Sequence, residues 1–276
     1  MRCACQLQPD WSIETMHIVE ELIAERAPKL MARPRLFQLI RPLLYRILAY
    51  DAAVFLVDAI RPMSGHNAFN MVTRHISPRI SVQNLQNLPS KGRCVLIANH
   101  PTGLADGMAV YQAIKDRRRD HVFLANADAL RVMPKANDII IPVEWVKDKR
   151  SVSKTKQTLL DVKQAFEEEK CIVIFPSGRL AQLGWKGLEE KPWESSAAML
   201  AKKYNAPVIP LRIRARNSTL YYLFTKLNGE LRDITLFHEL LNKKGKTFNM
   251  TFGEPINPKS LSKNANEATD FIRNIV

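Results

Sequence analysis

The sequence predicts an α/β fold with a mostly parallel sheet flanked by helices. Short apolar runs typical of buried strands, such as residues 94–98 and 171–175, are separated by longer segments with helical spacing. The distances between successive runs leave room for helical crossovers, which connect parallel strands. With 276 residues, the chain is long enough to bury a large core.

The chain divides into two predicted regions, a helical N-terminal segment at residues 1–78 and an α/β domain at residues 79–276. Between residues 26 and 50, six basic residues and no acidic ones are mixed with large apolar side chains. Pro34 and Pro42 are expected to divide this stretch into short helices. The mixture suits helices lying in the headgroup region of an anionic membrane. The alternative is ordinary helices packed on the domain with their arginines in solvent.

Charge order and apolar spacing justify the other helices. Residues 13–30 carry acids early and bases late, which suits the helix dipole. Residues 51–60 offer Val54, Phe55 and Val57 for burial. Leu159, Val162 and Phe166 mark one apolar face of a helix at residues 153–170. Further helices are expected at residues 104–115, 193–204, 233–242 and 260–275.

Strands are expected where apolar residues run unbroken or alternate with polar ones. Ile80 and Val82 alternate with polar neighbours within residues 79–85. The other predicted strands are residues 94–98, 121–125, 139–143, 171–175, 207–211 and 248–252. Residues 184–192 are expected to form a polar loop that could act as a lid or mouth.

The net charge restricts the class of partner. Forty-one Lys and Arg residues against 27 Asp and Glu residues give a formal charge of +14. Such a surplus favours an acidic partner: nucleic acid, anionic lipid headgroups or an acidic carrier protein. Because zinc-finger spacing, RNP-like aromatic blocks and basic heptad helices are missing from the sequence, we expect no nucleic-acid partner.

The cysteines do not indicate a metal site. Cys94 and Cys171 fall in predicted core strands, where they serve as small apolar residues. Cys3 and Cys5 have no second pair to complete a set of ligands. We therefore predict neither a metal nor a disulfide framework.

The predicted strand at residues 94–98 ends at a candidate catalytic pair. Pro101 favours an extended backbone at His100, and Gly103 allows a positive φ before the next helix. Asp106 falls in the first turn of that helix. A carboxylate there can accept a hydrogen bond from one ring nitrogen of His100 and leave the other nitrogen free as a base.

A second candidate loop follows the strand at residues 171–175. Pro176, Ser177, Gly178 and Arg179 combine a flexible turn with a cation. Acyl transfer builds negative charge on a carbonyl oxygen, and a phosphate-bearing substrate also needs a cation, so such a loop can serve either purpose. Both loops follow the carboxyl ends of strands, where open α/β sheets bind their ligands.

The block RCVLIANHPTGLADG at residues 93–107 resembles the signature of the glycerolipid acyltransferases, the family of bacterial 1-acyl-glycerol-3-phosphate acyltransferases. Three further blocks match in order, so the resemblance spans residues 81–256. The commonest spacing in the family places four residues between His and Asp, whereas five intervene here; a branch with the longer NHPTG-type block also exists. In the third block, usually Phe-Pro-Glu-Gly-Thr-Arg, Ser177 replaces the Glu and Arg179 comes one position early. In the second block, the frequent lysine is replaced by Asn126 or Ala127.

The resemblance implies an enzyme that moves a fatty acyl group from acyl-CoA or acyl carrier protein to a lysophospholipid hydroxyl, with no other cofactor. His100 would be the general base and Asp106 its partner, with loop N–H groups and Arg179 meeting the developing charge. The implied acceptor is 1-acyl-glycerol-3-phosphate, and the implied location is the cytoplasmic face of the inner membrane. The residues expected to bind substrate are Asn99, Thr102, Gly103, Phe175, Pro176, Ser177, Gly178 and Arg179.

Two alternatives remain open from the sequence. The missing lysine and the displaced arginine suggest another acceptor, such as a lyso-ornithine lipid. A non-catalytic lipid-binding or tethering protein would result if the longer loop separated His100 from Asp106.

Overall fold

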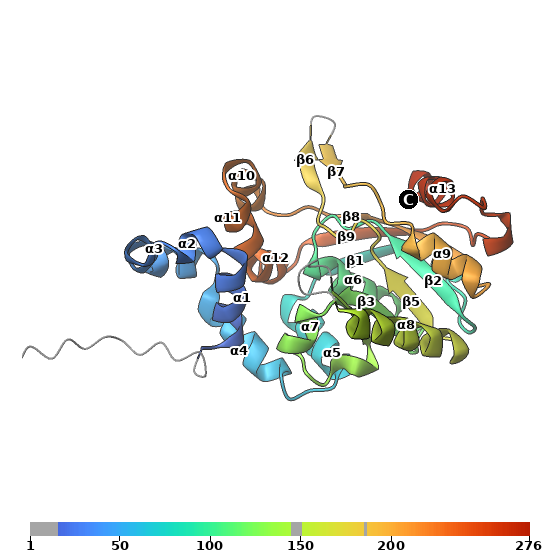
Figure 1. Ribbon diagram of the computed structural model, residues 1–276, viewed down its shortest axis with the longest axis horizontal. Coiled ribbons are helices and arrows are strands. Elements are labelled where there is room, and N and C mark those ends of the chain that lie inside the picture. Colours follow the sequence, from blue (N-terminus) through green and yellow to red (C-terminus); the bar gives the residue numbers. More distant parts are fainter. Residues whose placement is uncertain (1–15, 145–150, 185–186) are drawn as a thin grey trace, which may run out of the picture.

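The computed structural model describes residues 16–144, 151–184 and 187–276, and within them a seven-stranded sheet has the order β1-β9-β8-β2-β5-β3-β4 (Figure 1). All neighbouring strands are parallel except β8 and β9, which are antiparallel. This confirms the mostly parallel sheet. The strands are β1 (Arg79–Gln83), β2 (Cys94–Ala98), β3 (His121–Asn126), β4 (Ile140–Val143), β5 (Cys171–Ile174), β8 (Val208–Arg214) and β9 (Thr247–Phe252).

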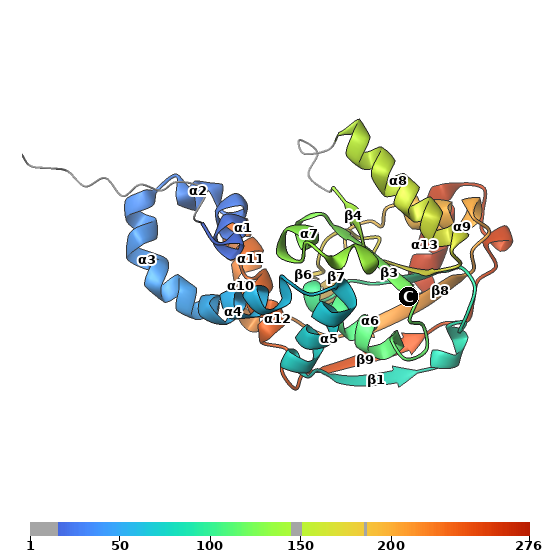
Figure 2. The same ribbon diagram turned by 90° about the horizontal axis from the view of Figure 1, so that it is seen from below.

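Helices cover both faces of the sheet, which explains why β2 is apolar at every position. Leu96 and Ala98 belong to a core shared with α5 (Gly65–Ile76) and α6 (Leu104–Ile114). Val95 and Ile97 face the opposite core. That second core includes residues of α8 (Val152–Glu167), α9 (Ser196–Lys203) and α13 (Ala265–Ile275). Figure 2 shows α8 and α9 on one side of the sheet and α5 and α6 on the other.

Seven helices gather at one end of the described part of the molecule, where the N-terminal segment meets a later insertion (Figures 1 and 2). They are α1 (Ile18–Arg26), α2 (Pro28–Met31), α3 (Pro34–Ile47), α4 (Tyr50–Ile60), α10 (Thr219–Leu227), α11 (Gly229–Ile234) and α12 (Leu236–Leu241). α1 and α2 contact α11, and α4 contacts α12. A salt bridge of 2.7 Å between Arg26 and Asp128 also ties α1 to α7 (Asp128–Val132).

Two expectations about the N-terminal helices were wrong. α3 runs through Pro42 as one helix, so only Pro34, at its first turn, marks a boundary. Pro42 lacks one backbone N–H donor but leaves α3 continuous on both sides. Phe55 is 65% exposed, because Ala53, Leu56 and Val57 form the buried face of α4.

Several elements were not predicted, among them α5 and the short strands β6 (Gln182–Gly184) and β7 (Gly187–Glu189). α5 is an additional helix with six buried residues. β6 and β7 form an antiparallel hairpin at the start of the expected polar loop. Cys3 and Cys5 lie outside the described residues. No helix within residues 16–144, 151–184 and 187–276 is long and apolar enough to cross a membrane.

Candidate active site

β2 carries His100 to the carboxyl edge of the sheet. The side chain of Asn99 donates to the carbonyl oxygen of Ile213 at 2.8 Å and accepts from the N–H of Ile213 at 2.6 Å. These two bonds fasten the end of β2 to β8. The backbone just before His100 is therefore held in place. Both polar groups of the Asn99 amide are occupied, which indicates a positioning role.

His100 and Asp106 meet where the loop joins α6. Nδ1 of His100 lies 3.0 Å from Oδ2 of Asp106, and the two side chains are 18% and 0% exposed. Gly103 reverses the chain with φ +81°, the left-handed conformation expected for it. The five intervening residues therefore keep the pair together. The contact has hydrogen-bond length but not hydrogen-bond geometry at Nδ1, and such misalignment is common in unliganded sites.

Hydrogen bonds from the loop fix the carboxylate of Asp106. Oδ2 accepts from the N–H groups of Thr102 at 2.7 Å and Gly103 at 2.9 Å, and Oδ1 accepts from the Thr102 hydroxyl at 2.5 Å. Such donors compensate for burying a charge. Thr102 and Gly103 were expected to bind substrate. That role stays a prediction; in this structure their donors hold Asp106.

The third block lies beside His100 because β5 is the parallel neighbour of β2. The Phe175 ring stacks on the imidazole of His100, with centroids 4.3 Å apart and an angle of 26° between the planes. Beyond it, the N–H of Gly178 donates to the carbonyl oxygen of Phe175 at 3.1 Å, closing a turn. Phe175 therefore restricts the orientation of the imidazole ring.

The remaining residues of this block have different surroundings. Pro176 and Ser177 are buried, and the Ser177 hydroxyl donates to the carbonyl oxygen of Arg179 at 2.9 Å. The hydroxyl of Ser177 thus stabilises the turn. The side chain of Arg179 is exposed.

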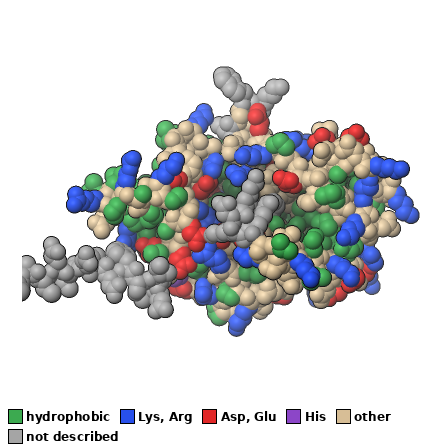
Figure 3. Space-filling model, viewed as in Figure 1, with side chains coloured by type: hydrophobic (Ala, Val, Ile, Leu, Met, Phe, Trp, Pro, Cys, Tyr) green, Lys and Arg blue, Asp and Glu red, His purple; other side chains and the backbone are tan. Residues whose placement is uncertain are grey.

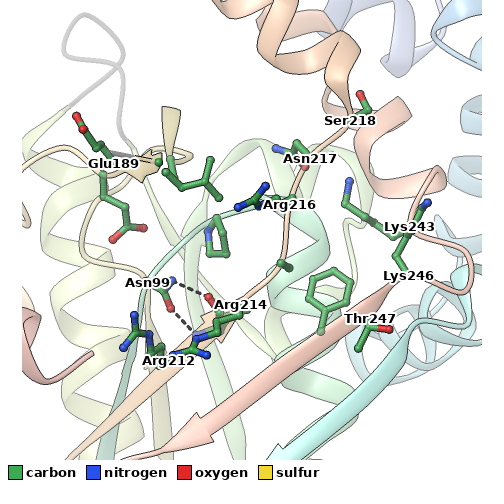
Figure 4. A pocket seen from close by; sticks show the side chains of 18 of the residues that line it. Asn99, Glu189, Arg212, Arg214, Arg216, Asn217, Ser218, Lys243, Lys246 and Thr247 are labelled. Atoms are coloured by element: carbon green, nitrogen blue, oxygen red, sulfur yellow. Dashed lines mark hydrogen bonds between the residues drawn. The ribbon is translucent and has the colours of Figure 1, made fainter. Parts of the chain in front are cut away.

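A cleft of about 1520 Å³ opens next to His100, and Asn99 and Pro101 line it on either side of that residue in the sequence. β8, the β6–β7 hairpin, the start of α10 and the start of β9 supply its other walls (Figure 4). Among the described lining residues, cations outnumber the two carboxylates, Glu189 and Glu190. The cationic lining residues are Arg212, Arg214, Arg216, Lys243, Lys246 and Arg273.

A buried ion pair lies at one wall of this cleft. Nζ of Lys243 is 2.9 Å from a carboxylate oxygen of Glu239, and both side chains are almost completely buried. Burial lowers the pKa of Lys243, and the carboxylate of Glu239 opposes this shift. The charge of Lys243 is therefore already compensated within the protein.

The sequence model of the Acyltransferase family matches residues 79–214. This segment is therefore an Acyltransferase domain. The matched segment extends from β1 to β8 and contains both loops that meet at His100. The protein is therefore an acyltransferase enzyme, and the arrangement around His100 is its candidate active site.

Two relatives and one solved structure are similar to this chain. A lyso-glycine lipid O-acyltransferase of Phocaeicola vulgatus is 23% identical, and the match covers 81% of each chain. A protein of the same name from Bacteroides thetaiotaomicron is 20% identical over 94% of this chain and 95% of its own. The crystal structure of the 1-acyl-sn-glycerophosphate (LPA) acyltransferase PlsC from Thermotoga maritima aligns with a TM-score of 0.48 and 15% identity, covering 92% of this chain and 94% of that one.

Two residues of the acyltransferase site were missed in the sequence. The backbone N–H of His100 donates to Oε1 of Glu190, and Oε2 of Glu190 accepts from Nε1 of Trp193 at 2.8 Å. The N–H of Ala181 also donates to the carbonyl oxygen of His100 at 3.1 Å. The segment after the third block thus holds the backbone at His100. No local pattern in the sequence marks this contact, because Glu190 lies 90 residues from His100.

Proposed function

We propose that this acyltransferase moves a fatty acyl group from a thioester, either acyl-CoA or acyl carrier protein, to the hydroxyl of an anionic lysolipid. The observation that carries this proposal is the 3.0 Å contact between Nδ1 of His100 and Oδ2 of Asp106. With Asp106 facing Nδ1, the Nε2 atom is the one left to take a proton from the acceptor. No further cofactor is required, because a thioester is already an activated acyl donor.

In the proposed reaction, the acceptor oxygen attacks the thioester carbonyl while its proton passes to Nε2 of His100. The carbon–sulfur bond then breaks, and the imidazolium returns the proton to the departing thiolate. Asp106 holds the ring in the required tautomer and stabilises its charged form. The stacked Phe175 side chain keeps the ring in one orientation.

The hydrogen bonds of the first loop bear on how the oxyanion would be stabilised. Loop N–H groups were expected to bind the carbonyl oxygen as it becomes negative, but those of Thr102 and Gly103 donate to Asp106. The N–H of His100 donates to Glu190, and Pro101 has none. We propose that Arg179, whose side chain is exposed in this structure, approaches the oxyanion when substrate is bound.

For the acceptor, the relatives favour a lyso-glycine lipid over 1-acyl-glycerol-3-phosphate. Both curated relatives carry the name lyso-glycine lipid O-acyltransferase, and one match covers 94% of this chain. The substitution of Asn126 or Ala127 for lysine and the early Arg179 point the same way, away from a phosphorylated acceptor. 1-Acyl-glycerol-3-phosphate remains the second candidate because of the cations that line the cleft.

We further propose that the enzyme works as a peripheral protein at the cytoplasmic face of the inner membrane. On α3, the exposed side chains of Leu36, Leu39 and Leu43 lie at helical spacing among basic residues. Figure 3 shows hydrophobic and basic side chains side by side at this helical end of the molecule. Such a surface can insert its leucines among acyl chains while its arginines remain at the level of anionic headgroups.

The experiment is an acyl-transfer assay with the purified full-length chain. Labelled acyl-CoA and acyl carrier protein are each offered with lyso-glycine lipid, lyso-ornithine lipid, 1-acyl-glycerol-3-phosphate and neutral monoacylglycerol. We expect ester product with lyso-glycine lipid, and none from the His100→Ala variant. Product with 1-acyl-glycerol-3-phosphate alone would identify that lipid as the acceptor in place of lyso-glycine lipid. Lipid binding without any product would leave the tethering alternative and remove the proposed reaction.

A further inference from the structure

Four cations that line the cleft have no ion-pair partner within the described chain. Arg212, Arg214, Arg216 and Lys246, here called the cationic cluster, all line the cleft. In contrast, the neighbouring Lys243 is paired with Glu239. Uncompensated like charges repel one another, so gathering them in a concave site favours an anion between them.

Asn217 lies beside the cationic cluster, and its side-chain amide lacks hydrogen-bond partners. Its side chain lines the cleft, the residue is only 8% exposed, and neither the oxygen nor the nitrogen of its amide has a hydrogen-bond partner. Buried amides are nearly always paired, as Asn99 is with Ile213. A bound group that both accepts and donates hydrogen bonds would satisfy the nitrogen and the oxygen of the Asn217 amide.

The position of these residues relative to the reacting centre restricts which substrate supplies the anion. Ile213, between Arg212 and Arg214, is bonded to Asn99, the residue next to His100. Figure 4 shows Arg214, Arg216 and Asn217 along the segment that leaves β8, with Lys246 on the adjoining wall. In a lysolipid, few bonds separate the reacting hydroxyl from the headgroup. In a thioester donor, the pantetheine arm separates the phosphate from the reacting carbonyl.

We propose that the cationic cluster and Asn217 form the subsite for the anionic headgroup of the acceptor, a carboxylate or a phosphate. This inference rests on the proposed function. Guanidinium groups pair with either oxyanion in a bidentate manner, and the amide of Asn217 adds a donor for the anion and an acceptor for a headgroup N–H or O–H. Arg179 of the third block is not among the residues that line this cleft. Recognition of the headgroup is thereby assigned to the end of β8.

The test compares Arg216→Ala, Lys246→Ala and Asn217→Asp with Lys244→Ala. Lys244 is exposed close to Lys246 in sequence but does not line the cleft, so its variant controls for loss of one charge. We expect KM for the anionic lysolipid to rise about tenfold or more in the three cleft variants. We expect KM for the acyl thioester to change less than about twofold in the same variants.

The outcomes separate this inference from the proposed function. If the wild-type enzyme acylates no lysolipid, the proposed function fails first. If it does so and the cleft variants keep the acceptor KM of Lys244→Ala, the subsite is wrong. If only the KM of the thioester rises, the cluster binds an anionic group of the acyl donor, and the assignment to the acceptor is wrong. Thermal unfolding of each variant is measured alongside, and Arg216→Lys, which keeps the charge but not the bidentate geometry, should raise the acceptor KM less than Arg216→Ala does.

Discussion

Glu190 connects His100 to Trp193: one oxygen of its carboxylate accepts from the His100 backbone N–H, and the other accepts from Nε1 of Trp193 at 2.8 Å. The interaction involves the backbone of His100 and not its imidazole, which indicates that Glu190 positions the chain. A positioning residue should change the rate of the chemical step more than substrate affinity.

We therefore predict that Glu190→Gln lowers kcat by about tenfold with KM nearly unchanged. Glutamine has one oxygen, so its NH₂ group would face one of the two N–H donors. Trp193→Phe removes only the more distant donor and should have a smaller effect. Steady-state kinetics distinguish the two outcomes. A Glu190→Gln enzyme with wild-type kcat would show that His100 is held adequately without this carboxylate.

Replacing the two members of the catalytic pair should have different consequences. His100→Ala is expected to lower kcat by ~10²-fold to ~10⁴-fold, the usual contribution of a general base. The unfolding free energy should fall by only roughly 1 kcal/mol, because the main loss is the stacking contact with Phe175. Asp106→Asn should lower both activity and stability, the latter by roughly 1–3 kcal/mol, because its NH₂ would face buried donors. Urea unfolding and initial rates measured together test this contrast.

Thr102 offers a milder test of the support around Asp106. Thr102→Val keeps the buried volume but removes the hydroxyl that donates to Oδ1 at 2.5 Å. We expect a loss of roughly 1–2 kcal/mol in unfolding free energy and a smaller fall in kcat than for Asp106→Asn. Thr102→Ser retains the hydroxyl and is the control. Equal kcat values for the Val and Ser variants would mean that the other two donors suffice.

The sequence predicted the strands near the site more accurately than the contacts between distant segments. Every position of β2 faces a core, so the strand appears as an unbroken apolar run, and the glycine at residue 103 indicated the turn before Asp106. The sequence also placed His100 and Phe175 at one edge of the sheet, because both lie at the carboxyl ends of predicted parallel strands, but it did not predict that β5 is the neighbour of β2. Their shared edge is a consequence of topology and needs no knowledge of side-chain packing.

Other features depended on tertiary contacts that leave no local pattern. Glu190 lies 90 residues from His100 in the sequence, and nothing in its neighbours marks it as a partner of a backbone N–H. Arg212 and Arg214 alternate with buried residues of β8, as the polar positions of any strand end would. Phe55 looked like a core residue, but the packing of α4 exposes it. Composition cannot show which face of a short helix meets its neighbours.

His121 predicts a dependence of stability on pH that is separate from catalysis. The residue is 1% exposed, and Nδ1 contacts the carbonyl oxygen of Arg118. Burial lowers the pKa of His121 to about 4, below its ordinary value of 6.5. The unfolded state therefore binds the proton more readily. The stabilising contribution is fully present above about pH 6.5 and is lost as pH falls toward about 4.

We predict that unfolding free energy decreases by up to roughly 3 kcal/mol across that range because of His121. In His121→Asn, whose amide can still donate to the Arg118 carbonyl, this part of the pH dependence should disappear. His75, which is exposed, provides the matched control variant His75→Asn. Urea unfolding at several pH values is the measurement. The same slope in all three proteins would show that other groups control acid stability.

The exposed leucines of α3 allow a direct test of membrane association. Leu39 and Leu43 are 79% and 63% exposed, and their spacing of four residues places them on the same face of the helix. Replacing both with glutamate removes apolar surface and adds two charges that anionic headgroups repel. We expect binding to vesicles containing anionic lipid to weaken at least roughly tenfold, as measured by co-sedimentation.

The control is Leu159→Glu, at a leucine that is 56% exposed on α8, away from the helical end. If this change weakens binding as strongly as the α3 changes do, the vesicles respond to net charge and α3 is not the docking surface; loss confined to α3 would place the membrane at the helical end of the molecule.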